Sequence, residues 1–211
     1  MNYSYNESDI KYAGALTEAQ LEVDRTDSIS GFGEFFTRKN NYSLTYEYDK
    51  DNIKIENTLN YNKKFSEGWS KIDTSFLSNE FKFKYNYKNN SLITGIDISE
   101  GSSKTNGVDK IIKNQLGLFA LNTYNFNDDL SINTGYRNEA IKLSYPSGKE
   151  KKYSENLFSL GTNYLYSDTG SVYVSFEQNY RTPATDEYRY GIYDSNTWAL
   201  IGYGYSEDLK P

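Results

Sequence analysis

The chain of 211 residues contains no cysteine, no histidine and only 3 prolines. Without cysteine it cannot form a disulfide or a thiolate metal site. Without histidine it lacks the commonest general base and the commonest metal ligand, so neither a Ser-His-Asp nor a Cys-His hydrolase site can be built. We therefore expect a protein that is not an enzyme and that holds neither a metal nor a cofactor.

Long apolar stretches are also missing. No run approaches the roughly 20 residues of a membrane helix, and no signal peptide is visible at Met1. The formal net charge of -6 excludes the basic surface of a nucleic-acid-binding protein. With a mean hydropathy of -0.80, these properties alone describe a soluble acidic protein.

The aromatic content contradicts that description. Aromatic residues make up 17% of the chain, and 22 residues are tyrosine. A disordered polar chain would be poor in aromatics. The strands of a transmembrane barrel hide their apolar residues from a window average, because every second residue faces a polar lumen. Low hydropathy combined with abundant tyrosine is what that alternation would produce.

Pairs of aromatic residues separated by one position recur along the chain, and each precedes a short polar segment. The pairs are Tyr46 and Tyr48, Tyr85 and Tyr87, Tyr124 and Phe126, and Tyr164 and Tyr166. Their second members, at 48, 87, 126 and 166, are 39, 39 and 40 residues apart. Tyr3 and Tyr5, before residues 6–9, are interpreted as a fifth copy. We predict that the eight residues of the first four pairs form one outward-facing girdle at one rim of a barrel.

The segments between the polar turns alternate as strands do. Phe81, Phe83 and Tyr85, for example, oppose Lys82 and Lys84. The opposite strand ends are predicted to be joined by longer loops at residues 64–78, 100–113 and 143–154. Residues 18–40 are interpreted as a strand end and a long loop. We predict about nine long antiparallel strands paired in sequence order.

Residues 171–190 carry the most specific motif. Val172, Val174, Phe176 and Tyr180 are predicted to lie on one face of a strand that continues to Arg181, and Pro183 ends its ladder. The sequence Tyr180, Arg181, any residue, Pro183, followed downstream by Asp208, Leu209, Lys210 and Pro211, resembles the TonB-dependent outer-membrane receptors. Residues 90–102 and 129–139 resemble two further strands of that family.

The resemblance implies an all-β fold, an antiparallel meander of long strands that is part of a large transmembrane β-barrel, open or partial as a fragment. Residues 1–211 would form one partial barrel domain without the plug domain and the energy-coupling box of the family. The implied location is the bacterial outer membrane. The implied partners are outer-membrane lipid and, for the full-length protein, the plug domain and the TonB energy-coupling complex.

The resemblance further implies import of a scarce nutrient, a ferric siderophore first, with heme and cobalamin as alternatives. The family's heme receptors usually offer a histidine after the Arg-x-Pro turn, and none is present between residues 184 and 206. The candidate ligand-binding residues are those of the last loop: Arg181, Asp186, Glu187, Tyr188, Tyr190, Tyr193 and Trp198. The first three could instead form an ion-pair cluster that orders the turn, and the aromatics could pack against neighbouring loops.

Readings of other classes are a soluble β-propeller, an adhesin-like binding protein and an outer-membrane enzyme. The repeat of about 40 residues matches a propeller blade, although a blade needs four short strands per repeat. Extrapolating the repeat predicts a sixth girdle pair at Tyr203 and Tyr205. The resemblance instead places Arg181 and Leu209 together at the long-loop end, far from Tyr166, and we adopt that prediction.

Overall fold

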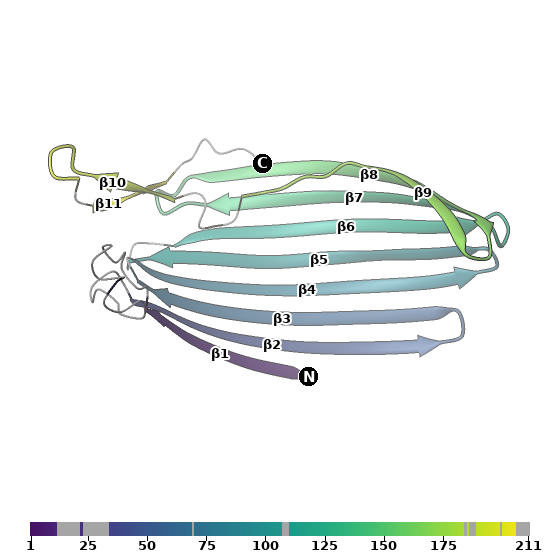
Figure 1. The fold of residues 1–211 in the computed structure, drawn as a ribbon, viewed down its shortest axis with the longest axis horizontal. Helices are drawn as coiled ribbons and strands as arrows, with labels where there is room; N and C mark the ends of the chain where they lie inside the picture. The colour runs from purple at the N-terminus through teal and green to yellow at the C-terminus, as the bar shows by residue number, and fades with distance from the viewer. Residues whose placement is uncertain are drawn as a thin grey trace.

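The structure is a computed structural model, and it describes residues 1–11, 22, 34–68, 70–106, 110–183, 185, 189–198 and 200–205. Nine strands form one antiparallel sheet in the order β1 to β9, and a separate hairpin pairs β10 with β11 (Figure 1). The strands are β1 Asn2–Lys11, β2 Glu34–Lys50, β3 Ile53–Glu67, β4 Lys71–Tyr87, β5 Asn90–Thr105, β6 Ile111–Asn125, β7 Leu130–Ser144, β8 Glu150–Ser167, β9 Gly170–Glu177, β10 Arg189–Tyr193 and β11 Leu200–Tyr205. The predicted meander of nine strands is confirmed, because each strand pairs only with its neighbours in sequence among the described residues.

The register separates two kinds of side chain onto two faces. Tyr46 and Ile55 lie on the same face as Phe83, Leu92, Tyr124, Leu130, Tyr164 and Val172, because cross-strand partners share a face. We call this the outer face. The opposite, inner face carries Lys54, Lys82, Asp97, Arg137 and Glu177. Large apolar side chains on the outer face are exposed, Phe176 by 63% and Leu160 by 55%, which is typical of a lipid-facing surface.

The connections at the two ends of the sheet differ less than predicted. At one end are the short turns, residues 51–52, 88–89, 126–129 and 168–169, and at the other end residues 68–70, 106–110 and 145–149 join the strands. We call these the turn end and the far end. The predicted long loops at 64–78, 100–113 and 143–154 are therefore mostly strand. The strands run 15 to 18 residues from β2 to β8, whereas a transmembrane strand needs about 9–11.

Polar side chains explain why these extensions escaped detection from the sequence. Beyond Leu77, Ile98 and Leu116, even the outer face becomes polar, with Ser75, Ser102 and Asn114 next along their strands. The alternation of apolar and polar residues then stops, although the backbone ladder continues. Ser75 and Ser102 maintain the pairing with a side-chain hydrogen bond of 2.9 Å between their Oγ atoms.

The first aromatic pair does not belong to the row at the turn end. Tyr3 pairs with Tyr42 and Tyr5 pairs with Asn40, so both lie well along β1, and residues 6–9 are strand rather than a turn. The interpretation of Tyr3 and Tyr5 as a fifth copy of the motif is wrong. Their rings instead extend a different row on the outer face, with Tyr3 and Tyr42 centroids 4.8 Å apart and Tyr42 and Tyr61 centroids 6.1 Å apart.

The buried apolar core is small and lies on the inner face at the far end. Ile111, Ile141, Leu143 and Tyr145 are buried, and Tyr153 and Tyr180 pack against them. Strand β9 ends at Glu177, so the prediction that it continues to Arg181 is wrong. The chain then leaves the ladder at Gln178, whose backbone N–H donates to Phe158 O (3.0 Å). Tyr180 consequently lies over the inner face, opposite the Phe176 face on which it was predicted.

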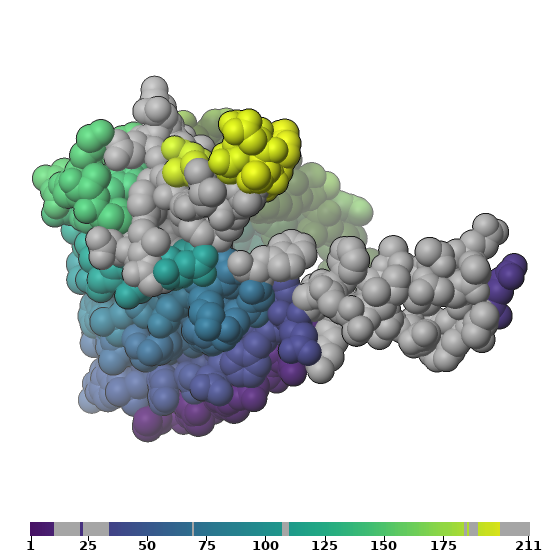
Figure 2. All heavy atoms as spheres, turned by 90° about the vertical axis from the view of Figure 1, so that its left-hand side faces the viewer, coloured from purple at the N-terminus to yellow at the C-terminus, as the bar shows by residue number. Residues whose placement is uncertain are grey.

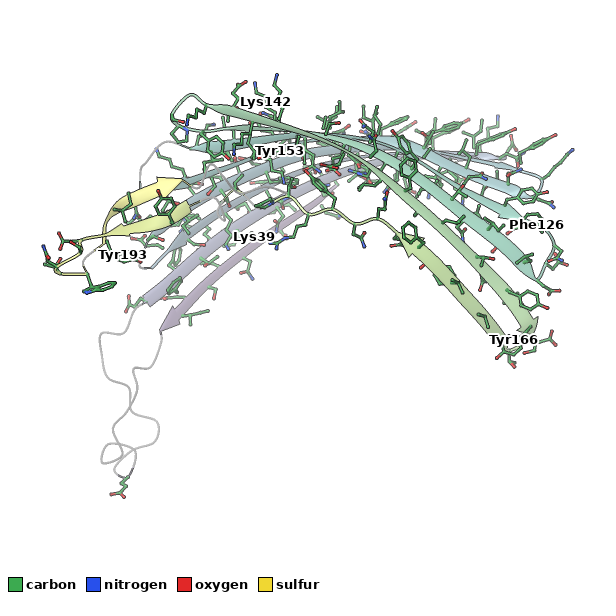
Figure 3. All side chains as sticks on the ribbon, turned by 90° about the horizontal axis from the view of Figure 1, so that it is seen from above. Lys39, Phe126, Lys142, Tyr153, Tyr166 and Tyr193 are labelled. Atoms are coloured by element: carbon green, nitrogen blue, oxygen red, sulfur yellow. The ribbon has the colours of Figure 1, made fainter. Side chains whose placement is uncertain are left out.

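Figure 3 shows the curved sheet as an arch, with the segment between β9 and β10 running beneath it. Tyr166 and Phe126 mark the turn end and Tyr193 lies at the opposite end. The space-filling view in Figure 2 looks onto the far end, where the hairpin of β10 and β11 lies beside the sheet. No helix in the described part of the chain is long and apolar enough to cross a membrane.

Candidate functional site

The inner face of the wall is built from rows of charged side chains. Arg137 Nη1 donates to Asp97 Oδ2 at 2.6 Å, and Arg137 Nε donates to Glu139 Oε2 at 3.2 Å. Gln115 donates a hydrogen bond to the other carboxylate oxygen of Glu139. Lys82 donates to Glu80 at 2.7 Å. Each of these bases therefore has an acidic partner on the wall.

Two glycines make room for this network. A Cβ at Gly95 would lie 2.3 Å from the carbonyl oxygen of Phe81 and 2.5 Å from the Phe119 ring, and a Cβ at Gly117 would lie 2.4 Å from Arg137 Nη2. The Arg137 guanidinium lies 5.8 Å from the centroid of the Phe119 ring, within the range of a cation–π contact. The glycines thus let a ring and a guanidinium lie flat against the backbone of the sheet.

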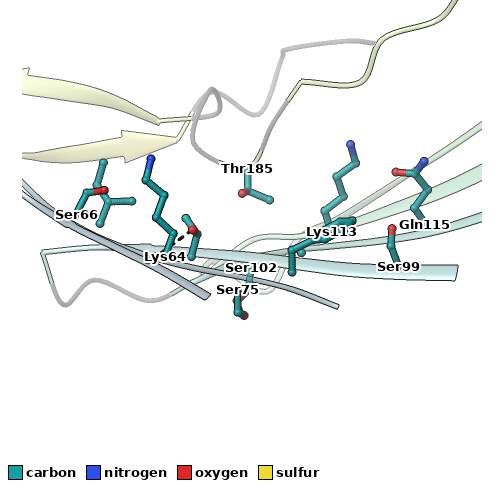
Figure 4. A pocket seen from close by; sticks show the side chains of 12 residues that line it. Lys64, Ser66, Ser75, Ser99, Ser102, Lys113, Gln115 and Thr185 are labelled. Atoms are coloured by element: carbon teal, nitrogen blue, oxygen red, sulfur yellow. Dashed lines mark hydrogen bonds between the residues drawn. The ribbon is translucent and has the colours of Figure 1, made fainter. Parts of the chain in front are cut away.

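Towards the far end, the inner face is hollowed beneath the segment that follows β9. A cavity of about 380 Å³ lies between strands β3 to β6 and Thr185. Its inner-face lining includes Lys64, Lys113, Gln115 and several hydroxyl side chains, and Figure 4 shows both lysines extending towards the overlying chain. Lys113 Nζ donates a hydrogen bond to Thr182 Oγ1, which ties that chain to β6.

Tyr180 anchors the segment beside this cavity. Its ring packs on the core cluster of Ile111, Ile141, Leu143 and Tyr145. Burial, with smaller contributions from Glu139 and Glu155, raises the pKa of Tyr180 to about 12. The phenol stays protonated at neutral pH, so Tyr180 acts as a neutral anchor.

The predicted ligand-binding residues fall into two groups. Asp186, Glu187 and Tyr188 lie outside the described residues. Arg181 follows the segment anchored at Tyr180, at the far end as predicted, next to the Thr182 contact with Lys113. Tyr190, Tyr193 and Trp198 belong to the β10–β11 hairpin and its turn, and they are exposed by 54%, 57% and 81%.

The turn of that hairpin is ordered by Asp194. Its Oδ1 accepts hydrogen bonds from the backbone N–H groups of Asn196 (2.9 Å) and Thr197 (2.8 Å) and from the Thr197 hydroxyl (3.0 Å). These bonds, led by the Thr197 backbone N–H, hold the pKa of the Asp194 carboxyl below its usual value. The hairpin therefore presents its aromatic side chains from a turn that is fixed at neutral pH.

The remaining motif residues divide in the same way. Tyr180 and Pro183 are part of the anchored segment, whereas Asp208, Leu209, Lys210 and Pro211 lie outside the described residues, and so does the predicted proximity of Leu209 to Arg181. Strand β11 lies at the far end in Figure 1. The sixth pair extrapolated from the repeat, Tyr203 and Tyr205, is thus not placed in the row of Tyr164 and Tyr166.

The eight predicted girdle residues all lie next to the short turns of β2 to β9. Within each of two strands the paired rings contact each other, with centroids 6.2 Å apart for Tyr85 and Tyr87 and 4.7 Å apart for Tyr124 and Phe126. The assignment of these rings to a membrane interface stays a prediction.

Lys64 and Lys113 were missed from the sequence, because both fell at the edges of predicted loops. Arg137 and Lys82 were interpreted as plain lining of a lumen. The signal that could have found the cavity is the row pattern of glycines and hydroxyl residues on β5, but it becomes visible only once the strands are in register.

Comparisons with known proteins agree with this architecture. The family model described as TonB dependent receptor-like, beta-barrel, matches residues 1–211. No curated protein sequence matches the chain. Among solved structures, the FrpB iron transporter from Neisseria meningitidis is similar with a TM-score of 0.69 at 12% identity, over 83% of this chain and 33% of that one.

Two further solved structures show the same fold. The ferric citrate transporter FecA in its unliganded form is similar with a TM-score of 0.63 at 15% identity, over 81% of this chain and 32% of that one. The copper transporter OprC has a TM-score of 0.63 at 13% identity, over 72% of this chain and 30% of that one. The chain spans about a third of the length of these solved relatives. With its nine-stranded meander, outer apolar face and charged inner face, the chain belongs to the TonB-dependent receptor β-barrel family.

Proposed function

We propose that the chain forms part of the wall of an outer-membrane transporter that imports a ferric chelate of the siderophore type. TonB-dependent receptors are outer-membrane transporters rather than enzymes. The observation that carries the proposal is the inner face, which is charged throughout and hollowed at the far end beneath the anchored segment at Tyr180. A wall of this kind offers a polar ligand a binding surface at one mouth of the barrel.

The choice of iron rests on the relatives and on the side chains present. FrpB is an iron transporter and FecA a ferric citrate transporter, whereas OprC transports copper. Copper is a soft-to-borderline ion that favours imidazole, thiolate and thioether ligands, and this chain has no histidine, no cysteine and one methionine. Heme is a weaker candidate for the same lack of histidine, and cobalamin has no specific observation in its favour. The soluble propeller is excluded, since a blade has four strands and this sheet has nine.

The proposed partners of the full-length protein are a plug domain within the lumen and the TonB energy-coupling complex. The charged rows around Arg137 would face that plug. Ferric chelate uptake is tested by deleting the full-length gene and supplying single iron sources under iron limitation. We expect lost growth on one ferric siderophore and normal growth on heme. Lost growth on heme alone, or on no source, would contradict the proposal.

The aromatic row at the turn end provides a separate test of membrane placement. We expect a tryptophan at position 85 (Tyr85→Trp), in the folded chain in lipid bilayers, to be quenched more by lipids brominated near the headgroup than by lipids brominated near the chain end. Phe81→Trp, two outward positions further along β4, should show the reverse order, because it would lie inside the apolar band of about 25 Å. The Trp198→Phe background removes the exposed indole of the hairpin. Equal quenching profiles at the two positions would remove the girdle assignment.

A further inference from the structure

The cavity at the far end differs in charge from the rest of the inner face. Its twelve lining residues include two lysines and no aspartate or glutamate. Nearer the middle of the wall, Lys82 and Arg137 each contact a carboxylate. The absence of acidic residues from the lining is also unexpected for a chain with a net charge of -6. In this part of the described wall, basic groups therefore face a hollow without acidic neighbours in the lining.

The register places the two lysines on opposite sides of the hollow. Lys64 lies on β3, paired with Thr74, and Lys113 lies on β6, paired with Gly101. Three strand spacings separate β3 from β6, which puts their backbones about 15 Å apart. Both side chains lean from the sheet towards the chain above it, as Figure 4 shows. Two long ammonium side chains can thus approach one compact ligand from opposite sides.

The floor between the lysines is open and hydroxyl-rich. Gly101 lies on the inner face between them, and a Cβ there would meet only one atom within 4 Å, Phe76 Cδ2 at 3.5 Å. Ser66, Thr74 and Ser99 add hydroxyl groups to the lining. Hydroxyls can donate to an anionic oxygen, and an ammonium group does so with charge assistance.

We propose that this cavity is a subsite for an anionic ferric chelate, whose carboxylate or phenolate oxygens are held by Lys64 and Lys113. The proposal rests on the proposed function and narrows it to chelates with net negative charge. A cationic or neutral hydroxamate chelate would leave both ammonium groups without an anionic partner. The overlying segment at Thr182, held by Lys113 itself, closes one side of the subsite.

The test is equilibrium dialysis of the 211-residue chain, folded in detergent micelles, against radioiron complexes. The probes are a trianionic ferric tricatecholate and the cationic ferric trihydroxamate ferrioxamine B. We expect the tricatecholate to bind at least about tenfold more tightly, with an affinity that falls as salt rises. Lys64→Gln and Lys113→Gln should each weaken its binding about tenfold, since one charge-assisted hydrogen bond is lost.

Matched variants separate the subsite from general effects of charge and folding. Lys54→Gln removes a lysine from the same face near the turn end and should leave binding unchanged, while Lys64→Arg should retain it. Gly101→Val projects methyl groups into the cavity and should weaken binding more than Gly101→Ala. Circular dichroism confirms that each variant folds. Equal affinity for the two probes, or wild-type affinity in the Lys64→Gln and Lys113→Gln double variant, would overturn the subsite.

The failure of the subsite is distinguishable from the failure of chelate import. If the gene deletion abolishes growth on a ferric siderophore while the lysine variants bind normally, import stands and the subsite is wrong. If the lysine variants lose tricatecholate binding while the deletion leaves growth on every iron source unchanged, the subsite stands and import is wrong.

Discussion

Replacing Gly95 with alanine is expected to lower the free energy of unfolding by about 3 kcal/mol, the upper range for overpacking a tight site. The added Cβ would lie 2.3 Å from the Phe81 carbonyl oxygen, a backbone atom of the neighbouring strand that cannot rotate away. It would also lie 2.5 Å from the Phe119 ring. Either β4 and β5 must separate locally, or the ring must leave its place beneath Arg137.

The measurement is urea unfolding of the chain folded in detergent micelles, followed by far-UV circular dichroism. Gly101→Ala is the matched control, because Gly101 lies on the same strand and face and its Cβ would make only an ordinary contact of 3.5 Å. We expect that control to lose less than about 0.5 kcal/mol. Adding Phe119→Ala to Gly95→Ala should not restore the wild-type value, since the carbonyl clash remains. Equal stability of the two alanine variants would show that Gly95 is not needed for room.

Removing the guanidinium of Arg137 should also weaken the fold. We expect Arg137→Met to lower the free energy of unfolding by about 2 kcal/mol, because it leaves the Asp97 and Glu139 carboxylates facing each other without their shared cation. Glu139 is the more sensitive partner, since only 9% of its side chain is exposed. The partial exposure of Arg137 and Asp97 keeps the effect below that of a fully buried pair.

The control for this prediction is Arg38→Met, which removes a cation from an exposed pair with Glu7 at 3.4 Å. Exposed pairs contribute about 0–1 kcal/mol, so little change is expected. Neutralising the carboxylates in the Arg137→Met background, with Asp97→Asn and Glu139→Gln, should recover at least half of the loss. If neutralisation brings no recovery, the loss arises from packing against Phe119 rather than from charge.

The fold was predictable from the sequence because its main determinant is local. Alternation and the polar turns before Ile53, Asn90 and Gly170 specify strand identity, strand order and the two faces. The extents of the strands were not predictable. Past the apolar band both faces are polar, so the pattern that marks a strand disappears while the backbone pairing persists.

The candidate site depended on contacts that alternation does not encode. Tyr180 continues the parity of Phe176 in the sequence, yet it packs on Ile111 of the inner face, because the chain leaves the sheet at Gln178. Lys64 and Lys113 are 49 positions apart in sequence (113 minus 64) and meet only through the register of four strands. Tyr3 misled the repeat analysis for the converse reason, since its spacing imitates a girdle pair while its register places it elsewhere.

The extended strands determine what the far end of the protein offers to large molecules in solution. Between β7 and β8 only residues 145–149 leave the ladder, and they form a tight turn in which the Lys149 carbonyl accepts from Tyr145 N at 2.9 Å and Gly148 adopts a φ of +82°. A protease must draw an extended stretch of substrate into its cleft, and an antibody raised against a linear peptide must find that peptide free. This connection satisfies neither requirement, so residues 145–149 should resist proteolysis in the folded chain and be recognised only by antibodies raised against the folded form.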